Sequence, residues 1–290
     1  MKILLCTDLD RTLLPNGSAP ETTNIRLLFN ELIDNFNIKL AYVSGRNADL
    51  VQQAISQYGL PQPDWVVSDV GTSIYKTDQA EWQYSQEWEN QISHDWHPCG
   101  FRDIESQLQS IDALVPQPPI HQNTFKLSYY LDLKHDHKPI FKNIHARLNE
   151  LGIHYNLIWS IDEPNKMGLV DILPANATKL HAIEYIAKLQ NLQPEQIVFS
   201  GDSGNDLPVM KSVLRSIIVK NAHSEVMTYI ERLLARSRES ADNIYIARGQ
   251  SGVGNGNYAS GIIEGLIHYH PNLEKSILKI SDQLLITSDQ

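Results

Sequence analysis

Two aspartates near the start of the chain, Asp8 and Asp10, follow a short apolar run over residues 2–6. An apolar run without alternation is typical of a strand that is buried on both faces of a parallel sheet. Carboxylates at the end of such a strand can serve as a nucleophile, as a general acid or base, or as ligands of a hard cation. The Asp-x-Asp spacing alone is a weak signal, because two acids after a strand often belong to a turn or a helix cap.

Three further polar clusters also follow apolar runs that we expect to be strands. They are Ser44-Gly45-Arg46, residues 68–72 and residues 201–206. Because open parallel sheets bind ligands at the carboxyl ends of their strands, we expect all of these clusters to meet at one edge. Lys179, at the start of a predicted helix, adds a cation, and Asn205 adds an amide. Together with the acids they could hold a magnesium ion beside a phosphate group.

Strands and helices alternate at both ends of the chain, which predicts an α/β fold with a doubly wound, Rossmann-like parallel sheet. In the first part the apolar patterns predict strands at 2–6, 38–43 and 65–67 and helices over 22–36 and 48–58. In the last part they predict helices over 177–189, 223–234 and 258–268 and strands at 197–199, 216–219 and 244–246. One sheet is therefore expected to be assembled from both ends of the chain.

The middle of the chain has a different pattern. Residues 125–133 and 153–161 alternate between apolar and polar side chains, which predicts half-covered antiparallel strands, with a helix between them and one more strand at 168–173. We therefore expect a core made of residues 1–77 and 172–290, with an inserted α+β cap domain over residues 78–171. The segment after Pro271 predicts an amphipathic helix of no evident role.

Composition excludes several classes of protein. Subtracting 34 acids from 24 bases gives a net charge of −10, which disfavours binding to nucleic acid or to anionic lipid. Two cysteines, Cys6 and Cys99, cannot form a disulfide framework in a chain of 290 residues. No apolar run approaches the length of a membrane span and no signal peptide is evident, so we expect a cytoplasmic protein that does not bind membranes.

Two conspicuous patterns are interpreted as structural. The glycines between residues 249 and 256 lack the spacing of a dinucleotide-binding fingerprint and predict a mobile loop. Trp82, Trp88 and Trp96 could form a platform for a sugar, but their spacing fits no single helix face, which favours packing.

Taken in order, the polar motifs resemble those of the haloacid dehalogenase superfamily of phosphatases. The resemblance rests on Asp8-Leu9-Asp10-Arg11-Thr12, Ser44-Gly45-Arg46, Lys179 and Gly201-Asp202-Ser203-Gly204-Asn205-Asp206, and it covers essentially the whole chain. The insertion lies where members with a large α+β cap of the C2 type carry that cap. Residues 69–75 and 259–266 most resemble the sucrose-phosphate phosphatase family.

The resemblance implies a role for each motif residue. Asp8 would attack phosphorus and form an aspartyl-phosphate, and Asp10 would act as the general acid and base. Mg²⁺ would be held by Asp8, Asp202 and the backbone carbonyl of Asp10, with Asp206 and Asn205 in support. The phosphate group would be held by four residues, which are Ser44, Gly45, Lys179 and Asn205.

The cap is expected to choose the sugar, because every core motif residue above serves the phosphate. Lys126, Ser128 and Tyr130 should project from one face of the strand over 125–133 and, with Arg46, could bind sugar hydroxyls. The alternative, a cap sheet whose polar face is simply exposed to water, is about equally compatible with the sequence.

The resemblance implies magnesium-dependent hydrolysis of a sugar phosphate, with sucrose 6-phosphate as the first candidate. Another glycosyl phosphate or a hexose phosphate remains an alternative. So does a non-catalytic module that partners a sucrose-phosphate synthase. A nucleotide-sugar transferase, which can also carry Asp-x-Asp, is disfavoured because only seven residues precede Asp8 and leave no room for a nucleotide-binding half.

Overall fold

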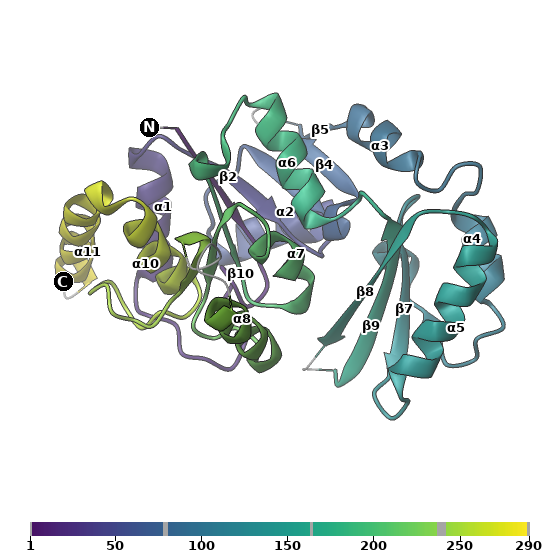
Figure 1. Cartoon of the computed structure of the whole chain (residues 1–290). Helices are drawn as coiled ribbons and strands as arrows, with labels where there is room; N and C mark the ends of the chain where they lie inside the picture. The colour runs from purple at the N-terminus through teal and green to yellow at the C-terminus, as the bar shows by residue number, and fades with distance from the viewer. Residues whose placement is uncertain (1, 78–80, 163–164, 237–241, 289–290) are drawn as a thin grey trace.

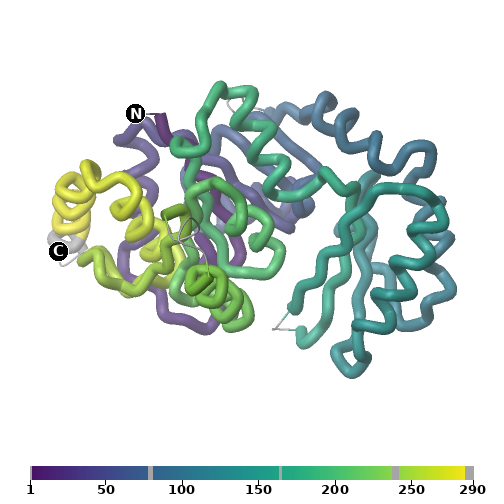
Figure 2. The backbone as a smooth tube through the Cα atoms, in the orientation of Figure 1, coloured from purple at the N-terminus to yellow at the C-terminus, as the bar shows by residue number. Residues whose placement is uncertain are grey.

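The structure is a computed structural model that describes residues 2–77, 81–162, 165–236 and 242–288. A larger α/β unit contains both ends of the described chain, and a smaller unit built from the middle of the chain lies beside it (Figure 1). The tube in Figure 2 shows that segments far apart in sequence, in purple and in green, lie together in the larger unit. This is the predicted arrangement, in which both ends of the chain build the core.

The core sheet has the strand order β12-β11-β10-β1-β2-β3-β4-β5. Its parallel strands are β1 (Ile3–Thr7), β2 (Ile38–Val43), β3 (Trp65–Ser68), β10 (Ile197–Gly201), β11 (Arg215–Ile218) and β12 (Ile244–Ile246). Two antiparallel strands, β4 (Ser73–Lys76) and β5 (Gln83–Tyr84), extend the sheet beyond β3. Strand β1 is central and all five of its residues are buried, which explains its unbroken apolar run.

Helices cover both faces of the core sheet, so the doubly wound α/β fold is confirmed. One apolar layer contains α1 (Ile25–Asn35), α2 (Ala48–Tyr58), α10 (Ala259–Tyr269) and α11 (Glu274–Ser288). The other contains α3 (Gln86–Ser93), α6 (Lys179–Leu189), α7 (Leu207–Met210) and α8 (Ser224–Arg236). The helix predicted after Pro271 is α11, which packs on α1 and buries Ile277.

The smaller unit is an α+β cap with the antiparallel strand order β6-β7-β9-β8. Its strands are β6 (Val115–Pro116), β7 (Leu127–Asp132), β8 (Tyr155–Asp162) and β9 (Met167–Pro174). Helices α4 (Phe101–Leu108) and α5 (His137–Glu150) cover the face of this sheet that is turned away from the core (Figure 1). The other face is turned toward the core, whereas the alternation in β7 predicted only that one face of the strand is covered.

Short 3₁₀ helices complete the described elements: η1 (Asp69–Gly71), η2 (Pro119–His121), η3 (Pro194–Gln196), η4 (Gly204–Asp206) and η5 (Pro271–Leu273). Two of the tryptophans that sequence analysis assigned to packing are fully buried. Trp88 lies in the core layer under α6 and donates its indole N–H to the carbonyl of Gly71, and Trp96 lies in the cap layer.

The structure differs from the predicted cap range at both ends. Strand β5 pairs with β4 in the core sheet, and β9 extends through Pro174 in the cap sheet. Residue 78, the predicted start of the cap, lies outside the described residues. Asp95 accepts hydrogen bonds from the backbone N–H and side-chain amide of Asn176, at 2.7 and 3.0 Å, which ties the outgoing and returning segments together. We propose these two residues as the points where the chain enters and leaves the cap.

The glycine-rich loop between residues 249 and 256 is held by a buried carboxylate rather than left free. Glu264 of α10 accepts the backbone N–H groups of Arg248, Gly249 and Gln250 and the hydroxyl of Tyr245. Left-handed φ values and close backbone approach explain the glycines: a Cβ on Gly249 would lie 2.6 Å from the carbonyl oxygen of Asn255. The loop that sequence predicts to be mobile is therefore anchored at residues 248–250 by Glu264.

Candidate active site

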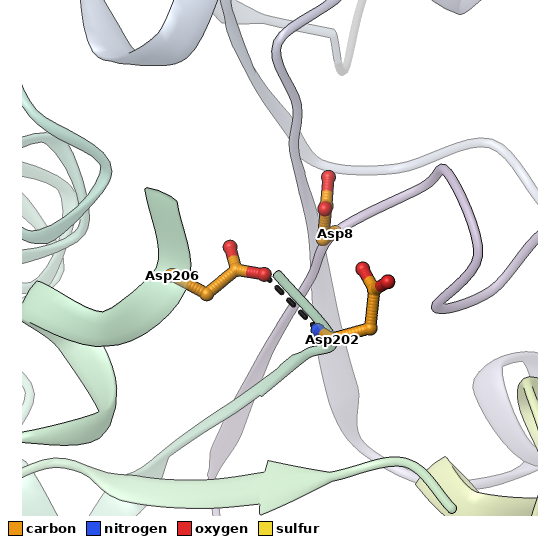
Figure 3. A group of neighbouring side chains, drawn as sticks. All are labelled: Asp8, Asp202 and Asp206. Atoms are coloured by element: carbon orange, nitrogen blue, oxygen red, sulfur yellow. Dashed lines mark hydrogen bonds between the residues drawn. The ribbon is translucent and has the colours of Figure 1, made fainter. Parts of the chain in front are cut away.

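Three acidic side chains gather where β1 and β10 end, as Figure 3 shows. Asp8 follows β1, and its backbone N–H donates to the carbonyl of Ser200, which locks the ends of the two strands together at 2.9 Å. Asp202 follows β10, and Asp206 closes the 3₁₀ turn η4. One carboxylate oxygen from each lies within 4.8 Å of the others. The acids lie close together, as predicted, because the parallel strands that precede them end at the same edge of the sheet.

The turn that carries Asp202 and Asp206 is fixed by its own hydrogen bonds. Oδ2 of Asp206 accepts the backbone N–H of Asp202 at 3.0 Å (Figure 3). The same oxygen accepts the backbone N–H of Ser203, also at 3.0 Å. A Cβ on Gly201 would lie 2.5 Å from that same oxygen, so only glycine permits this close approach. Asp202 is held in turn by the hydroxyl of Thr12, which donates to its Oδ1 at 3.0 Å. The carboxylates are therefore positioned before any ligand binds.

Lys179 supplies the cation of the cluster from the first residue of α6. Thr178 caps this helix, and its side-chain oxygen accepts the backbone N–H of His181. The Lys179 ammonium lies 2.7 Å from Oδ1 of Asp206 and 3.2 Å from Oδ2 of Asp8. Burial opposes its charged form, but the charges of Asp206 and Asp8 raise the pKa of Lys179 above its ordinary value. Lys179 therefore stays protonated between the two acids.

The Lys179 ammonium and the Arg11 guanidinium, which lies 3.5 Å from Oδ2 of Asp202, do not balance three buried carboxylates. Burial raises the pKa of Asp8 well above its ordinary value, with Lys179 opposing the rise and Asp206 and Asp202 adding to it. Burial and the charge of Asp206 raise the pKa of Asp202 to about 7. A divalent cation would restore the ionised form of both acids. Hard oxygen donors at this spacing fit Mg²⁺, and Asp8, Asp202 and Asp206 are the side chains that could hold it.

The predicted phosphate-binding residues surround this acid cluster. Ser44 is fully buried, and its hydroxyl oxygen accepts the backbone N–H of Arg46, which leaves the hydroxyl proton for a ligand. Gly45 and Asn205 line the cavity above the acids. The side chain of Asn205 is turned toward its own loop, where Oδ1 accepts the hydroxyl of Ser203 at 2.9 Å.

Asp10 lines the same cavity, but its side chain lies outside the acid cluster. Oδ1 of Asp10 accepts a hydrogen bond from Nη2 of Arg46 at 2.7 Å, and Oδ2 accepts one from Nε at 2.8 Å. The side-chain amide of Asn16 also donates to Oδ1, at 2.6 Å. This hydrogen bonding raises the pKa of Arg46. The prediction that Asp10 contacts a metal can therefore apply only to its backbone carbonyl. Arg46, predicted to bind the sugar, lines the cavity and also donates to both carboxylate oxygens of Asp10, the predicted acid and base.

A cavity of about 670 Å³ opens between the core and the cap above these residues. Its core wall includes Asp8, Asp10 and Asp202, and its cap wall includes Lys126 and Tyr130. Ser44, Lys179 and Asp206 are buried next to the cavity rather than lining it. Ser128, predicted to bind the sugar, is fully buried and does not line the cavity. Its hydroxyl donates to Asp171, which does line the cavity.

Three residues that no sequence motif indicated also line the cavity: Asn16, Trp159 and Asp171. Asp171 lies on β9 directly opposite Ser128 of β7, a pairing that only the cap sheet register reveals. Trp159, on the edge strand β8, stacks on His137 with a centroid separation of 5.2 Å. The alternation over residues 153–161 includes Trp159 among its apolar residues but does not indicate a ligand site.

Within the described residues, no helix is both long enough and apolar enough to cross a membrane. Comparison with known proteins identifies the family. Residues 1–270 match the sucrose-6F-phosphate phosphohydrolase family model. A putative haloacid dehalogenase-like hydrolase of Nitrosococcus oceani is 43% identical over 270 residues, covering 93% of this chain and 72% of that protein. A mannosylfructose-phosphate phosphatase of Agrobacterium fabrum is 28% identical over 273 residues, covering 93% and 97% of the two chains.

Solved structures agree with the fold and with the family. The sucrose-phosphatase of Synechocystis, solved with sucrose and phosphate, superposes with a TM-score of 0.75 at 28% identity, covering 93% of this chain and 98% of that one. A haloacid dehalogenase-like hydrolase of Bacillus subtilis shares the fold at 17% identity with a TM-score of 0.60, covering 92% and 91% of the two chains. The acid cluster, the buried lysine, the cap and the family match lead to one conclusion: the chain is a phosphoric monoester hydrolase that belongs to the sucrose-6F-phosphate phosphohydrolase family of the haloacid dehalogenase superfamily.

Proposed function

We propose that this protein hydrolyses the phosphate ester of a disaccharide, with sucrose 6-phosphate as the preferred substrate and Mg²⁺ as the cofactor. The observation that carries the proposal is the shared cavity, in which the core acids form one wall and polar cap residues form another. Its volume of about 670 Å³ lies within the range of sites that enclose a whole small molecule, roughly 300–1,000 Å³. A site for inorganic phosphate alone would not need a second wall.

In the proposed reaction Asp8 is the nucleophile. It attacks phosphorus in line with the departing sugar oxygen and forms an aspartyl-phosphate, which water then hydrolyses. Its N–H bond to Ser200 and its ion pair with Lys179 fix its position at the end of β1. Lys179 and the Ser44 hydroxyl offset the negative charge of the phosphoryl oxygens. When bound, Mg²⁺ would neutralise part of the charge of the acids and the phosphate.

Asp10 is the proposed general acid and base. It would give a proton to the departing sugar oxygen and later take one from the attacking water. Arg46 and Asn16 hold both of its oxygens, so these two residues determine where the carboxyl group points. The presence of Asp10 in the cavity favours turnover over a non-catalytic module, which has no need of a general acid. A partnership with a sucrose-phosphate synthase and a cytoplasmic location remain predictions.

The cap wall is proposed to recognise the sugar. Lys126 presents a cation, Tyr130 a phenol and Asp171 a carboxylate to the cavity, and such groups bind hydroxyls. Trp159 borders the cavity at the edge strand β8, but its ring packs on His137 and Phe141 of α5, so we assign it to support of the cap wall rather than to sugar binding. Ser128 is proposed to act only through Asp171, because its hydroxyl is already donated to that carboxylate.

A phosphate-release assay over a panel of esters tests this proposal. The panel should contain sucrose 6-phosphate, mannosylfructose phosphate, glucose 6-phosphate, fructose 6-phosphate and p-nitrophenyl phosphate. Two of the similar proteins are named as a sucrose-phosphatase and a mannosylfructose-phosphate phosphatase, so the second disaccharide is the main competing substrate. We expect the highest kcat/KM for sucrose 6-phosphate. A hexose phosphate as the best substrate would contradict the proposal.

A further inference from the structure

A buried ion pair crosses the boundary between the cap and the core. The Lys126 ammonium, just before β7 of the cap, lies 3.6 Å from Oδ1 of Asp69, just after β3 of the core. The side chains are only 6% and 8% exposed. Burial raises the pKa of Asp69, and the charge of Lys126 counteracts that rise. Each group is therefore the electrostatic partner that makes burial of the other tolerable.

Asp69 reaches the cap because of an unusual backbone path. Asp69 and Val70 both adopt left-handed conformations, with φ of 53° and 64°, which is costly for a β-branched residue such as Val70. Two hydrogen bonds hold this path to residues 44–46, the proposed phosphate-binding loop: Asp69 N–H donates to the Arg46 carbonyl at 2.8 Å, and Val70 N–H donates to the Ser44 carbonyl at 3.0 Å. The strained turn thus connects the phosphate-binding loop to the cap.

The cap side of the pair is fixed as well. Lys126 and Asn123 exchange backbone hydrogen bonds, each at 3.2 Å. The Asn123 side-chain amide donates to the Thr72 hydroxyl of the core at 2.9 Å. The short turn that carries Lys126 is therefore attached to the same core turn that carries Asp69. Separation of the cap from the core would break both contacts at once.

The pair leaves Lys126 able to bind a ligand. The Lys126 ammonium has three N–H donors, and its contact with Asp69 at 3.6 Å uses at most one of them, so donors remain for a ligand. Lys126 lines the cavity, whereas Asp69 lies behind it. A buried ion pair is weak evidence for stabilisation, because desolvation offsets much of its attraction. Strain, burial and a cavity-facing cation together point to a role in binding.

We infer that Asp69 is a positioning residue for sugar discrimination, which holds the Lys126 ammonium over the cavity while the cap lies against the core. The inference rests on the proposed recognition of the sugar by the cap. Its consequence is that Lys126 is correctly placed only in the closed arrangement, so that binding of the sugar favours closure. The phosphate chemistry itself does not require Asp69.

Asp69→Asn tests the inference with little change of shape, because asparagine tolerates the left-handed conformation as well as aspartate does. With the preferred sugar phosphate, KM should rise about tenfold while kcat changes less than about threefold. With p-nitrophenyl phosphate, kcat/KM should fall much less. Asp132→Asn is the matched control, since Asp132 ends β7 and pairs with the exposed Lys134. It should leave both substrates unaffected.

A double-mutant cycle separates positioning from a general structural effect. Lys126→Met should produce the same substrate-selective loss, and Asp69→Asn combined with Lys126→Met should be no worse than Lys126→Met alone. Additive losses, equal losses on both substrates, or no effect of Asp69→Asn would overturn the inference. If Asp69→Asn fails to fold, Asn123→Ala, which loosens the same turn without unpairing a charge, should show the same selectivity in smaller measure.

These outcomes are distinguishable from failure of the proposed function. If the wild-type protein prefers an ester other than a disaccharide phosphate, the proposed substrate is wrong. The same variants measured on that ester still show whether Asp69 acts through Lys126. If the wild-type protein does prefer the disaccharide phosphate but the cycle is additive, only the inference about Asp69 fails.

Discussion

The ammonium nitrogen of Lys179 lies 2.7 Å from Oδ1 of Asp206, and both side chains are enclosed by the core. Through Asp206, Lys179 is coupled to the turn that holds Asp202, because the other oxygen of Asp206 accepts the Asp202 N–H. The pair therefore connects the first residue of α6 to the end of β10 and fixes the acid cluster from one side.

Lys179→Met should damage both stability and activity. Removing one member of a buried pair leaves an uncompensated charge, which costs about 3–5 kcal/mol of folding free energy. We expect kcat/KM to fall at least about a hundredfold, because the phosphoryl oxygens also lose a cation. Urea denaturation and phosphate release measure the two effects. Lys188→Met, at an exposed position of the same helix, is the control and should change neither.

Magnesium should bind to the acid cluster even without substrate. Saturation at about a hundred times Kd stabilises a folded protein by roughly 2.7 kcal/mol, so a thermal melt should shift upward by several degrees. Asp202→Asn should remove most of this shift, whereas Asp34→Asn, at an exposed position of α1, should retain it. Excess chelator should stop phosphate release, and added Mg²⁺ should restore it. Full activity in chelator would show that the acids do not serve a metal.

Much of the core was predictable from sequence, because a parallel strand buried on both faces leaves an unbroken apolar run. The predicted range for β2 coincides with Ile38–Val43 and that for α2 with Ala48–Tyr58. The polar clusters at the strand ends then meet because the strands are parallel. The acid cluster and Lys179 follow from this rule together with the resemblance to a known family.

The cap wall of the cavity was less predictable, because it depends on pairing between strands that are distant in sequence. Asp171 reaches the cavity only because β9 lies between β7 and β8. Strand β5 has two residues, too few for a periodic signal, and so its place in the core sheet was missed. The hydrogen bonds from Arg46 to Asp10 join residues that are 36 positions apart in the sequence. Neither the spacing of these residues nor the composition of the chain indicates the contact.

Asp10→Asn should affect substrates according to their leaving groups. A sugar alkoxide needs a proton to depart, and general acid catalysis contributes about 10²–10⁴-fold. p-Nitrophenolate departs without one, so its release in the first turnover should remain fast while later turnovers slow. Stopped-flow absorbance should therefore show a burst of p-nitrophenol with this variant. If the rate of the burst and the rate of sugar phosphate hydrolysis fall by the same factor, Asp10 positions the substrate rather than transferring a proton.

His270 should make the folded protein sensitive to acid. Burial, with the charge of Arg215 acting in the same direction, lowers the pKa of this side chain to about 4. Because the unfolded chain takes up the proton near pH 6.5, the stability from neutral His270 is complete above that pH. It is lost as the pH falls toward 4, by at most about 3 kcal/mol.

His270→Leu should remove this pH dependence. The free energy of unfolding of both proteins is measured by urea denaturation with Mg²⁺ present. Between pH 7 and pH 5 the wild type should lose more of this free energy than the variant does. His154→Leu, at an exposed position of the cap, is the control and should show no such trend. A difference that does not vary with pH would mean that His270 is not buried in its neutral form.

The central claim is that Asp8 performs the hydrolysis of a disaccharide phosphate. Its most direct test is the rate of phosphate release from sucrose 6-phosphate, measured with Mg²⁺ for purified wild type and for Asp8→Asn. The amide keeps the shape of the side chain but is a poor nucleophile and a weaker ligand for magnesium. We predict efficient release by the wild type and a loss of at least about a thousandfold in the variant, with an unchanged circular dichroism spectrum. Near-normal release by Asp8→Asn, or no release by the wild type, would contradict the account.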